Sequence, residues 1–230
     1  MSKIIVGQIL KNDEVVGTGF LVSPDIVMTA KHNLVTVDEI YKENFKEKEV
    51  IFRFNKTDAV SGCTINLVEA IDKGIDCVYI RLEEVLSDKE IPILVENENS
   101  IKDYSCSIVG YPKLSSCEMS LEGTIVSEGD EIYVWIKKED RLQEYQGLSG
   151  APLIISGNVI GIIIIQENTE QLKALSTKYI IKNLSSDALK SVKRDIPNCL
   201  FDIDVGMTML KSKVEQIMKI VGPRYSKKLN

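Results

Sequence analysis

Short runs of apolar and β-branched residues, separated by turn-forming residues, repeat along the first 180 positions of the chain. Segments 4–6 and 15–22 flank a polar turn at 11–14, a pattern that indicates a β-hairpin. The same reasoning predicts strands over 26–29, 50–54, 64–68 and 77–82, and then over 104–109, 123–126, 132–136, 151–155 and 159–165. Strands at this spacing, with almost no helical periodicity, predict an all-β sandwich or barrel.

A polar stretch near 96–102 divides these strands into two series. We therefore expect two β domains of similar size, at residues 1–90 and 91–182. Residues 38–50 are rich in charge, which is typical of a solvated loop or a short surface helix.

The remaining residues, 183–230, are expected to form a helical extension or linker. Ser185, Ser186 and Asp187 are candidates to cap one helix, which Pro197 ends. Apolar residues at three- and four-residue spacing between 207 and 221 predict a second, amphipathic helix. Its apolar face is expected to dock on the β body, with contact to a partner protein as the alternative.

Composition narrows the function classes. A net charge of -6 argues against a nucleic-acid-binding surface. No apolar run reaches 18 residues, so no membrane partner is expected, and the first residues are too polar for a signal peptide. The five cysteines are odd in number and lack close pair spacing, which favours free thiols in a cytoplasmic protein. With one histidine and no clustered cysteines, neither a metal nor another cofactor is expected.

Three segments place reactive side chains where a predicted strand meets a turn. They are 17–33, which ends in Thr-Ala-Lys-His-Asn, 74–82, which begins Gly-Ile-Asp, and 147–154, which begins Gly-Leu-Ser-Gly-Ala-Pro. They supply His32, Asp76 and Ser149. A serine hydroxyl needs a base to become a nucleophile, imidazole titrates near neutrality, and a carboxylate can orient the imidazole. The three residue types together indicate nucleophilic acyl transfer.

These segments resemble the chymotrypsin-like (trypsin-fold) serine peptidases, over about residues 3–182, and most closely their intracellular bacterial members. The resemblance implies two six-stranded antiparallel β-barrels, here with a helical C-terminal extension. It implies that His32 is the general base, Asp76 the orienting acid and Ser149 the nucleophile, with the amides of Gly147 and Ser149 as the oxyanion hole. It places Gln143, Glu144, Ile164 and Gln166 near the substrate pocket, with strand 159–166 pairing with substrate backbone.

Other interpretations of the same residues are weaker. The segment 147–151 also approximates the nucleophile elbow of α/β-hydrolases, but that fold needs a helix after the serine and a histidine later in the chain. Here Pro152 follows, and no histidine exists beyond position 32. A subtilisin-like order using Asp25 would require alternating helices. Asp72 is an alternative candidate for the orienting acid. The spacing to the predicted strand at 78–80 favours Asp76 over Asp72.

Two departures from the family pattern bear on regulation. Leu148 stands where digestive relatives carry an aspartate that pairs with a new N-terminus, so activation by N-terminal insertion is not expected. Asn33 stands where secreted members have a disulfide cysteine. The helical tail resembles junctions that join a trypsin-like effector to an NLR/STAND-type NTPase in antiphage defence, although no phosphate-binding GxxxxGK[ST] motif is present.

The sequence thus predicts a regulated intracellular serine endopeptidase, or effector module, that acts on a protein or peptide and is fused to or associated with a sensor domain. The alternative is a catalytically silent module of the same fold that binds a peptide or protein partner.

Overall fold

The structure is a computed structural model that describes residues 4–36, 39, 47–54, 58–86, 94–95, 100–113, 117–142 and 144–184. The two predicted helices of the C-terminal extension, the predicted pocket residue Gln143 and Cys199 lie outside the described residues.

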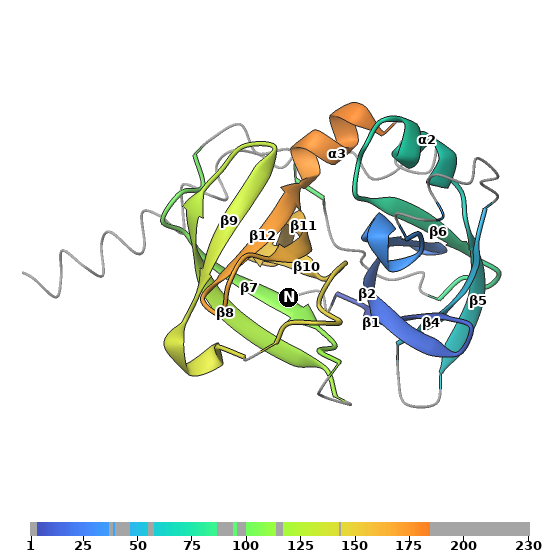
Figure 1. Ribbon diagram of the computed structural model, residues 1–230, viewed down its shortest axis with the longest axis horizontal. Helices are drawn as coiled ribbons and strands as arrows, with labels where there is room; N and C mark the ends of the chain where they lie inside the picture. The colour runs from blue at the N-terminus through green and yellow to red at the C-terminus, as the bar shows by residue number, and fades with distance from the viewer. Residues whose placement is uncertain are drawn as a thin grey trace, which may run out of the picture. The chain divides into compact units, whose positions relative to one another are not determined.

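The first six strands form a closed barrel (Figure 1). They are β1 (Val6–Lys11), β2 (Glu14–Ser23), β3 (Ile26–Thr29), β4 (Glu49–Arg53), β5 (Ala59–Thr64) and β6 (Val78–Leu82). Their order around the barrel is β1-β2-β3-β6-β5-β4, and pairing of β4 with β1 closes it.

The second barrel repeats this arrangement (Figure 1). Its strands are β7 (Ser105–Gly110), β8 (Met119–Ser127), β9 (Glu131–Ile136), β10 (Pro152–Ile155), β11 (Asn158–Gln166) and β12 (Gln171–Ser176). The order is β10-β11-β12-β9-β8-β7, with β10 pairing back onto β7. The predicted fold class, two six-stranded antiparallel barrels, is confirmed. Closure leaves neither sheet with an unpaired edge.

The sequence pattern explains these strands. In β9 buried and more exposed residues alternate, as expected for a strand with one face toward a core. The predicted first hairpin is confirmed: Asn12 and Asp13 both adopt positive φ, 52° and 64°, which a two-residue turn of this kind requires. In β11 the long isoleucine run is buried over most of its length.

Three short elements differ from the prediction. The segment 64–68 was expected to be one strand, but β5 ends at Thr64 and helix α2 (Leu67–Asp72) follows. Leu67 and Ala70, three positions apart, are the buried residues of that helix, so the apolar run serves a helical face. Strand β12 and helix α3 (Thr177–Asn183), which Ser176 caps by accepting a hydrogen bond from the Tyr179 N–H, were not predicted.

Helix α3 lies beside α2, where Nζ of Lys73 donates a 2.7 Å hydrogen bond to the carbonyl of Asn183 (Figure 1). Both helices are short. Within the described part of the chain, no helix has the length and apolar character needed to cross a membrane.

Candidate active site

The lone histidine lies in a single tight turn at the end of β3. This turn, η1 (Lys31–Asn33), is a 3-10 helix in which the Leu34 N–H donates to the Lys31 carbonyl at 2.9 Å. The His32 N–H is not used inside the turn and donates instead to Oδ1 of Asp76, at 2.9 Å. The imidazole is 42% exposed, so it lies at the surface of the first barrel.

Asp76 reaches this turn because α2 ends abruptly before it. Gly74 adopts φ +65°, and the N–H of Ile75 donates to the carbonyl of Ala70, the hydrogen-bond pattern that ends helices at glycine. Strand β6 begins two residues after Asp76. Asp72, the competing carboxylate, ends α2 and is exposed. The structure therefore brings Asp76 to His32.

The second oxygen of Asp76 defines the protonation of the imidazole ring. Oδ2 lies 2.7 Å from Nδ1 of His32. Burial raises the pKa of Asp76, but hydrogen bonds and charge from His32 outweigh burial and lower it below its usual value. An ionised carboxylate can only accept, so Nδ1 carries the proton and Nε2 of the neutral ring keeps its lone pair. That nitrogen can act as a base.

Ser149 lies in the second of two consecutive turns before β10. The Leu148 N–H donates to the Tyr145 carbonyl at 3.0 Å, and the Ala151 N–H donates to the Leu148 carbonyl at 2.9 Å. The Gly150 N–H donates to the Ile163 carbonyl of β11 at 2.7 Å, which ties the turn to the barrel. Leu148 is fully buried, and a Cβ added to Gly110 would meet its side chain at 2.7 Å.

Hydrogen bonds between the two barrels hold this turn. The carbonyl of Ser149 accepts from the Thr18 N–H and from Nδ2 of Asn33, both at 2.9 Å. Oγ1 of Thr18 donates to the Gly147 carbonyl at 2.6 Å. Thr18 and Asn33 belong to the motif segment 17–33, but the sequence pattern alone predicts no role for either of them. The signal for Thr18 was a polar residue inside an otherwise apolar strand, and Asn33 had no such signal.

Gly147 is oriented by its neighbours. Its φ is +92°, and a Cβ there would meet the Tyr111 carbonyl oxygen at 2.5 Å, so only glycine fits. The Gln146 carbonyl accepts from the Lys113 N–H at 2.5 Å. Since N–H and C=O point in opposite directions across a trans peptide, the Gly147 N–H faces away from Lys113. Among the described residues, the N–H groups of Gly147 and Ser149 donate to no protein acceptor.

The predicted pocket residues fall in different environments. Glu144 is exposed, and Ile164 is buried in the core. Gln166, at the end of β11, accepts a 3.1 Å hydrogen bond through Oε1 from the N–H of Tyr145. Tyr145 is itself buried and donates through its hydroxyl to the Thr169 carbonyl at 3.0 Å. The side chain of Gln166 thus connects the end of β11 to the segment that leads to Ser149.

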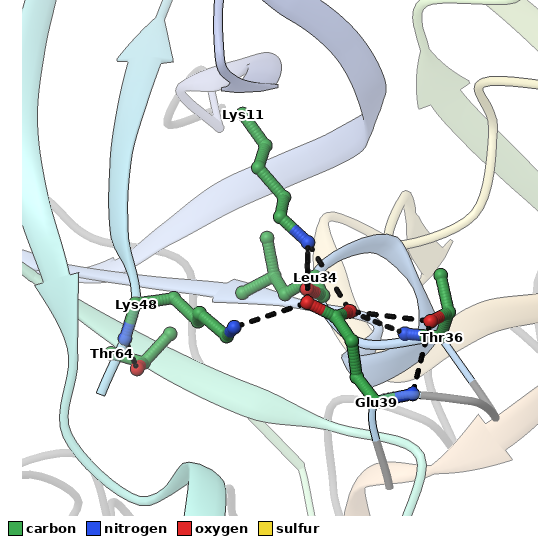
Figure 2. Close-up of polar contacts among 6 residues, drawn as sticks. All are labelled: Lys11, Leu34, Thr36, Glu39, Lys48 and Thr64. Carbon is green, nitrogen blue, oxygen red and sulfur yellow. Dashed lines mark hydrogen bonds and ion pairs between the residues drawn. The ribbon is translucent and has the colours of Figure 1, made fainter. Parts of the chain in front are cut away.

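A charged cluster supports the chain just after His32 (Figure 2). Glu39 and Thr36 form a reciprocal capping box: the Thr36 N–H donates to Oε2 of Glu39 at 2.9 Å, and the Glu39 N–H donates to Oγ1 of Thr36 at 3.3 Å. Lys11 and Lys48 flank the Glu39 carboxylate at 3.4 Å and 3.2 Å. Lys11 also donates to the Leu34 carbonyl at 2.8 Å. The cluster anchors the segment after η1 to the first barrel.

The two buried thiols of the described residues are poor nucleophiles. Burial raises the pKa of Cys77 well above its ordinary value and that of Cys106 to about 12, so both stay protonated near neutral pH. Within the described ranges, no group of three His, Cys, Asp or Glu side chains could hold a metal ion.

The fold and this site agree with the family comparison. The model of the trypsin-like peptidase domain matches residues 17–162, a range that contains His32, Asp76 and Ser149. The chain belongs to the family of trypsin-like peptidase domains and is a serine protease, a hydrolase whose substrates are peptides or proteins. No sequence among the curated proteins matches it.

Solved structures share the fold at low sequence identity. The inactive form of the Rv3671c protease of M. tuberculosis is 17% identical with a TM-score of 0.58, covering 83% of this chain and 89% of that one. A Glu endopeptidase is 15% identical with a TM-score of 0.59, covering 76% and 86%. A mutant of human heparin binding protein is 14% identical with a TM-score of 0.61, covering 84% and 94%.

Proposed function

We propose that this protein is an endopeptidase that uses Ser149 as nucleophile, His32 as general base and Asp76 as orienting acid. The observation that carries the proposal is the two-point contact of Asp76 with His32, in which Oδ2 of Asp76 faces Nδ1 and so favours the neutral tautomer that has its lone pair on Nε2. The Asn33 amide, one residue further on, binds the carbonyl of Ser149 and so ties the serine to the same turn.

The reaction proceeds in two halves. Oγ of Ser149 attacks the peptide carbonyl carbon while Nε2 of His32 takes the hydroxyl proton. The C–N bond breaks as the imidazolium returns that proton to the leaving amine, which gives an acyl-enzyme. Water then attacks the carbonyl carbon of the ester while His32 takes a proton from the water. The C–O bond to Ser149 breaks, and Oγ of Ser149 receives that proton from His32 as the new carboxylic acid is released. Asp76 stabilises the imidazolium in both halves.

The amides of Gly147 and Ser149 are the proposed donors to the carbonyl oxygen as it gains charge. The direction of the Gly147 N–H and the lack of a protein acceptor for either amide among the described residues support this role. Leu148, between them, is apolar and buried, so it offers no carboxylate for an activating N-terminal charge. We therefore expect that the site does not need cleavage of the chain at its N-terminus to become active.

The decisive test is labelling by a fluorophosphonate probe, which phosphonylates an activated serine. The wild-type chain is expected to label at Ser149, and Ser149→Ala is expected not to label. Intact mass spectrometry and peptide mapping locate the adduct. A wild type that reacts no faster than Ser149→Ala would contradict the proposal.

We propose that Gln143, Glu144, Ile164 and Gln166 border the substrate pocket. The hydrogen bond from the Tyr145 N–H holds the Gln166 side chain against the segment that leads to Ser149, and this supports a preference for small side chains before the cleaved bond. Glu144 is exposed and could favour a basic residue there instead. A peptide-library profile distinguishes the two: Gln166→Gly should admit larger residues, and Glu144→Gln should lose any basic preference. A preference for Asp or Glu would contradict both.

The cellular setting that we propose is the cytoplasm, within a regulated module of bacterial antiphage defence. The thiols of Cys63, Cys77 and Cys106 support a reducing compartment. The proposed partner is a fused or associated NTPase or sensor domain. The gene and its neighbours can be inspected for such a domain. If neither the gene itself nor the genes beside it encode an NTPase or sensor domain, the proposed partner is contradicted.

A second candidate is a binding module that has the fold but does not cleave. Its support is that human heparin binding protein, named for binding, has the same fold. Under this hypothesis Ser149→Ala retains full affinity for the partner while the wild type shows no labelling and no cleavage.

A further inference from the structure

Asn33 has a buried carboxamide at the junction of the two barrels. The residue is 8% exposed, and Nδ2 donates to the Ser149 carbonyl at 2.9 Å and to Oγ1 of Thr29 at 3.1 Å. We propose that Asn33 is a positioning residue that sets the nucleophile in register with the general base. The inference rests on the proposed function, because it assigns catalytic roles to His32 and Ser149.

His32 and Asn33 share one turn. Both belong to η1, and Asp76 fixes the backbone of this turn by accepting from the His32 N–H. The imidazole and the carboxamide therefore project from one fixed turn. The carboxamide of Asn33 also binds the Ser149 carbonyl. The nucleophile is therefore hydrogen-bonded to the residue that directly follows the general base in the chain.

The site requires a donor at this position. The Thr29 hydroxyl gives its proton to the Thr18 carbonyl at 2.7 Å, so its oxygen accepts from Asn33. The Ser149 carbonyl also accepts. Both contacts of Nδ2 therefore need N–H groups, which leucine or aspartate of similar size does not provide. A glutamine would be too long, because the carboxamide already fills the space beside Gly17.

Loss of Asn33 is expected to loosen the serine rather than to unfold it. The Thr18 N–H still holds the Ser149 carbonyl, and Oγ1 of Thr18 still holds the Gly147 carbonyl. The variants can thus be compared as folded proteins. Their melting temperatures are recorded beside each rate.

The experiment measures the second-order rate of fluorophosphonate labelling, and kcat and KM per titrated active site on a peptide ester. The variants are Asn33→Leu, Asn33→Asp and Asn183→Leu. Asn183 is the matched control because its carboxamide also donates to a backbone carbonyl, that of Tyr179 at 2.8 Å, but in α3. Asn33→Leu should lose roughly ten- to a hundredfold in labelling rate and kcat with KM little changed. Asn183→Leu should match the wild type.

Asn33→Asp adds a signature that a merely structural residue does not give. A protonated carboxyl can again donate to the Ser149 carbonyl, whereas an ionised one repels it. The ratio of its labelling rate to that of Asn33→Leu should therefore rise as the pH falls.

The outcomes separate the two proposals. If the wild type labels and Asn33→Leu labels at the same rate per folded molecule, the positioning role of Asn33 is overturned and the proposed function stands. A pH-independent ratio between Asn33→Asp and Asn33→Leu does the same. A wild type that does not label overturns the proposed function and this inference with it.

Discussion

Asp76 holds His32 at two points, with Oδ1 on the backbone N–H at 2.9 Å and Oδ2 on Nδ1 at 2.7 Å. The first contact fixes the turn, and the second fixes the tilt and the protonation of the ring. One carboxylate therefore sets where the imidazole lies and which tautomer of the neutral ring is favoured.

Replacing Asp76 by Asn should lower kcat by roughly 10³- to 10⁴-fold, because an amide can donate to Nδ1 and so favours the wrong ring tautomer. Steady-state cleavage of a peptide ester measures the loss. Asp72→Asn is the matched control, since Asp72 is exposed at the end of α2 and is expected to leave kcat unchanged. Equal losses in the two variants would refute the assignment.

His32→Ala should abolish turnover and labelling, because the chain has no second imidazole. The ring is 42% exposed, so its removal leaves no internal cavity, and the melting temperature should stay close to that of the wild type. Circular dichroism and labelling of the same sample test this. Residual serine labelling at the wild-type rate would show that another group activates Ser149.

Gly17→Ala should reproduce the loss expected for Asn33, because a Cβ at position 17 would lie 2.1 Å from Nδ2 of Asn33 and must displace the carboxamide. A double-mutant cycle with Asn33→Ala tests the shared cause. Once the carboxamide is gone the added methyl has room, so the double variant should be no slower than Asn33→Ala. Gly129→Ala, whose Cβ would meet nothing closer than 3.7 Å, is the control. Additive losses would show that the two residues act separately.

Glu39 should make the fold sensitive to acid. The hydrogen bond from the Thr36 N–H, together with Lys48 and Lys11, outweighs burial and holds the pKa of Glu39 at about 2, below its ordinary 4.5. A lowered folded-state pKa contributes stability that is complete above about 4.5 and is lost as the pH falls toward about 2.

Urea unfolding between pH 6 and about 2 measures this linkage. Glu39→Gln should flatten the decline in the free energy of unfolding over the acid range, relative to the wild type. Glu84→Gln removes an exposed carboxylate outside the cluster and serves as the control for lost charge. Parallel curves for Glu39→Gln and the wild type would refute the role of the cluster.

Local patterns predicted much of the β structure because strand alternation and turn residues are local properties. The hairpin at Asn12 and Asp13 and the second series of strands are examples. Helix α2 was missed because Leu67 and Ala70 occupy a short apolar run, and only contact with the barrel decides whether such a run is a strand or a helix.

The sequence by itself determined the candidate reactive residues and their order along the chain. A single histidine before the serine, with an aspartate between them, indicated one family of mechanism and excluded others. Only the tertiary structure decided that Asp76 rather than Asp72 meets His32, and that Thr18 and Asn33 hold the serine turn. The physical reason is that these contacts join residues from 44 to more than 100 positions apart, and closure of each barrel together with contact between the two barrels, not local propensity, sets such distances.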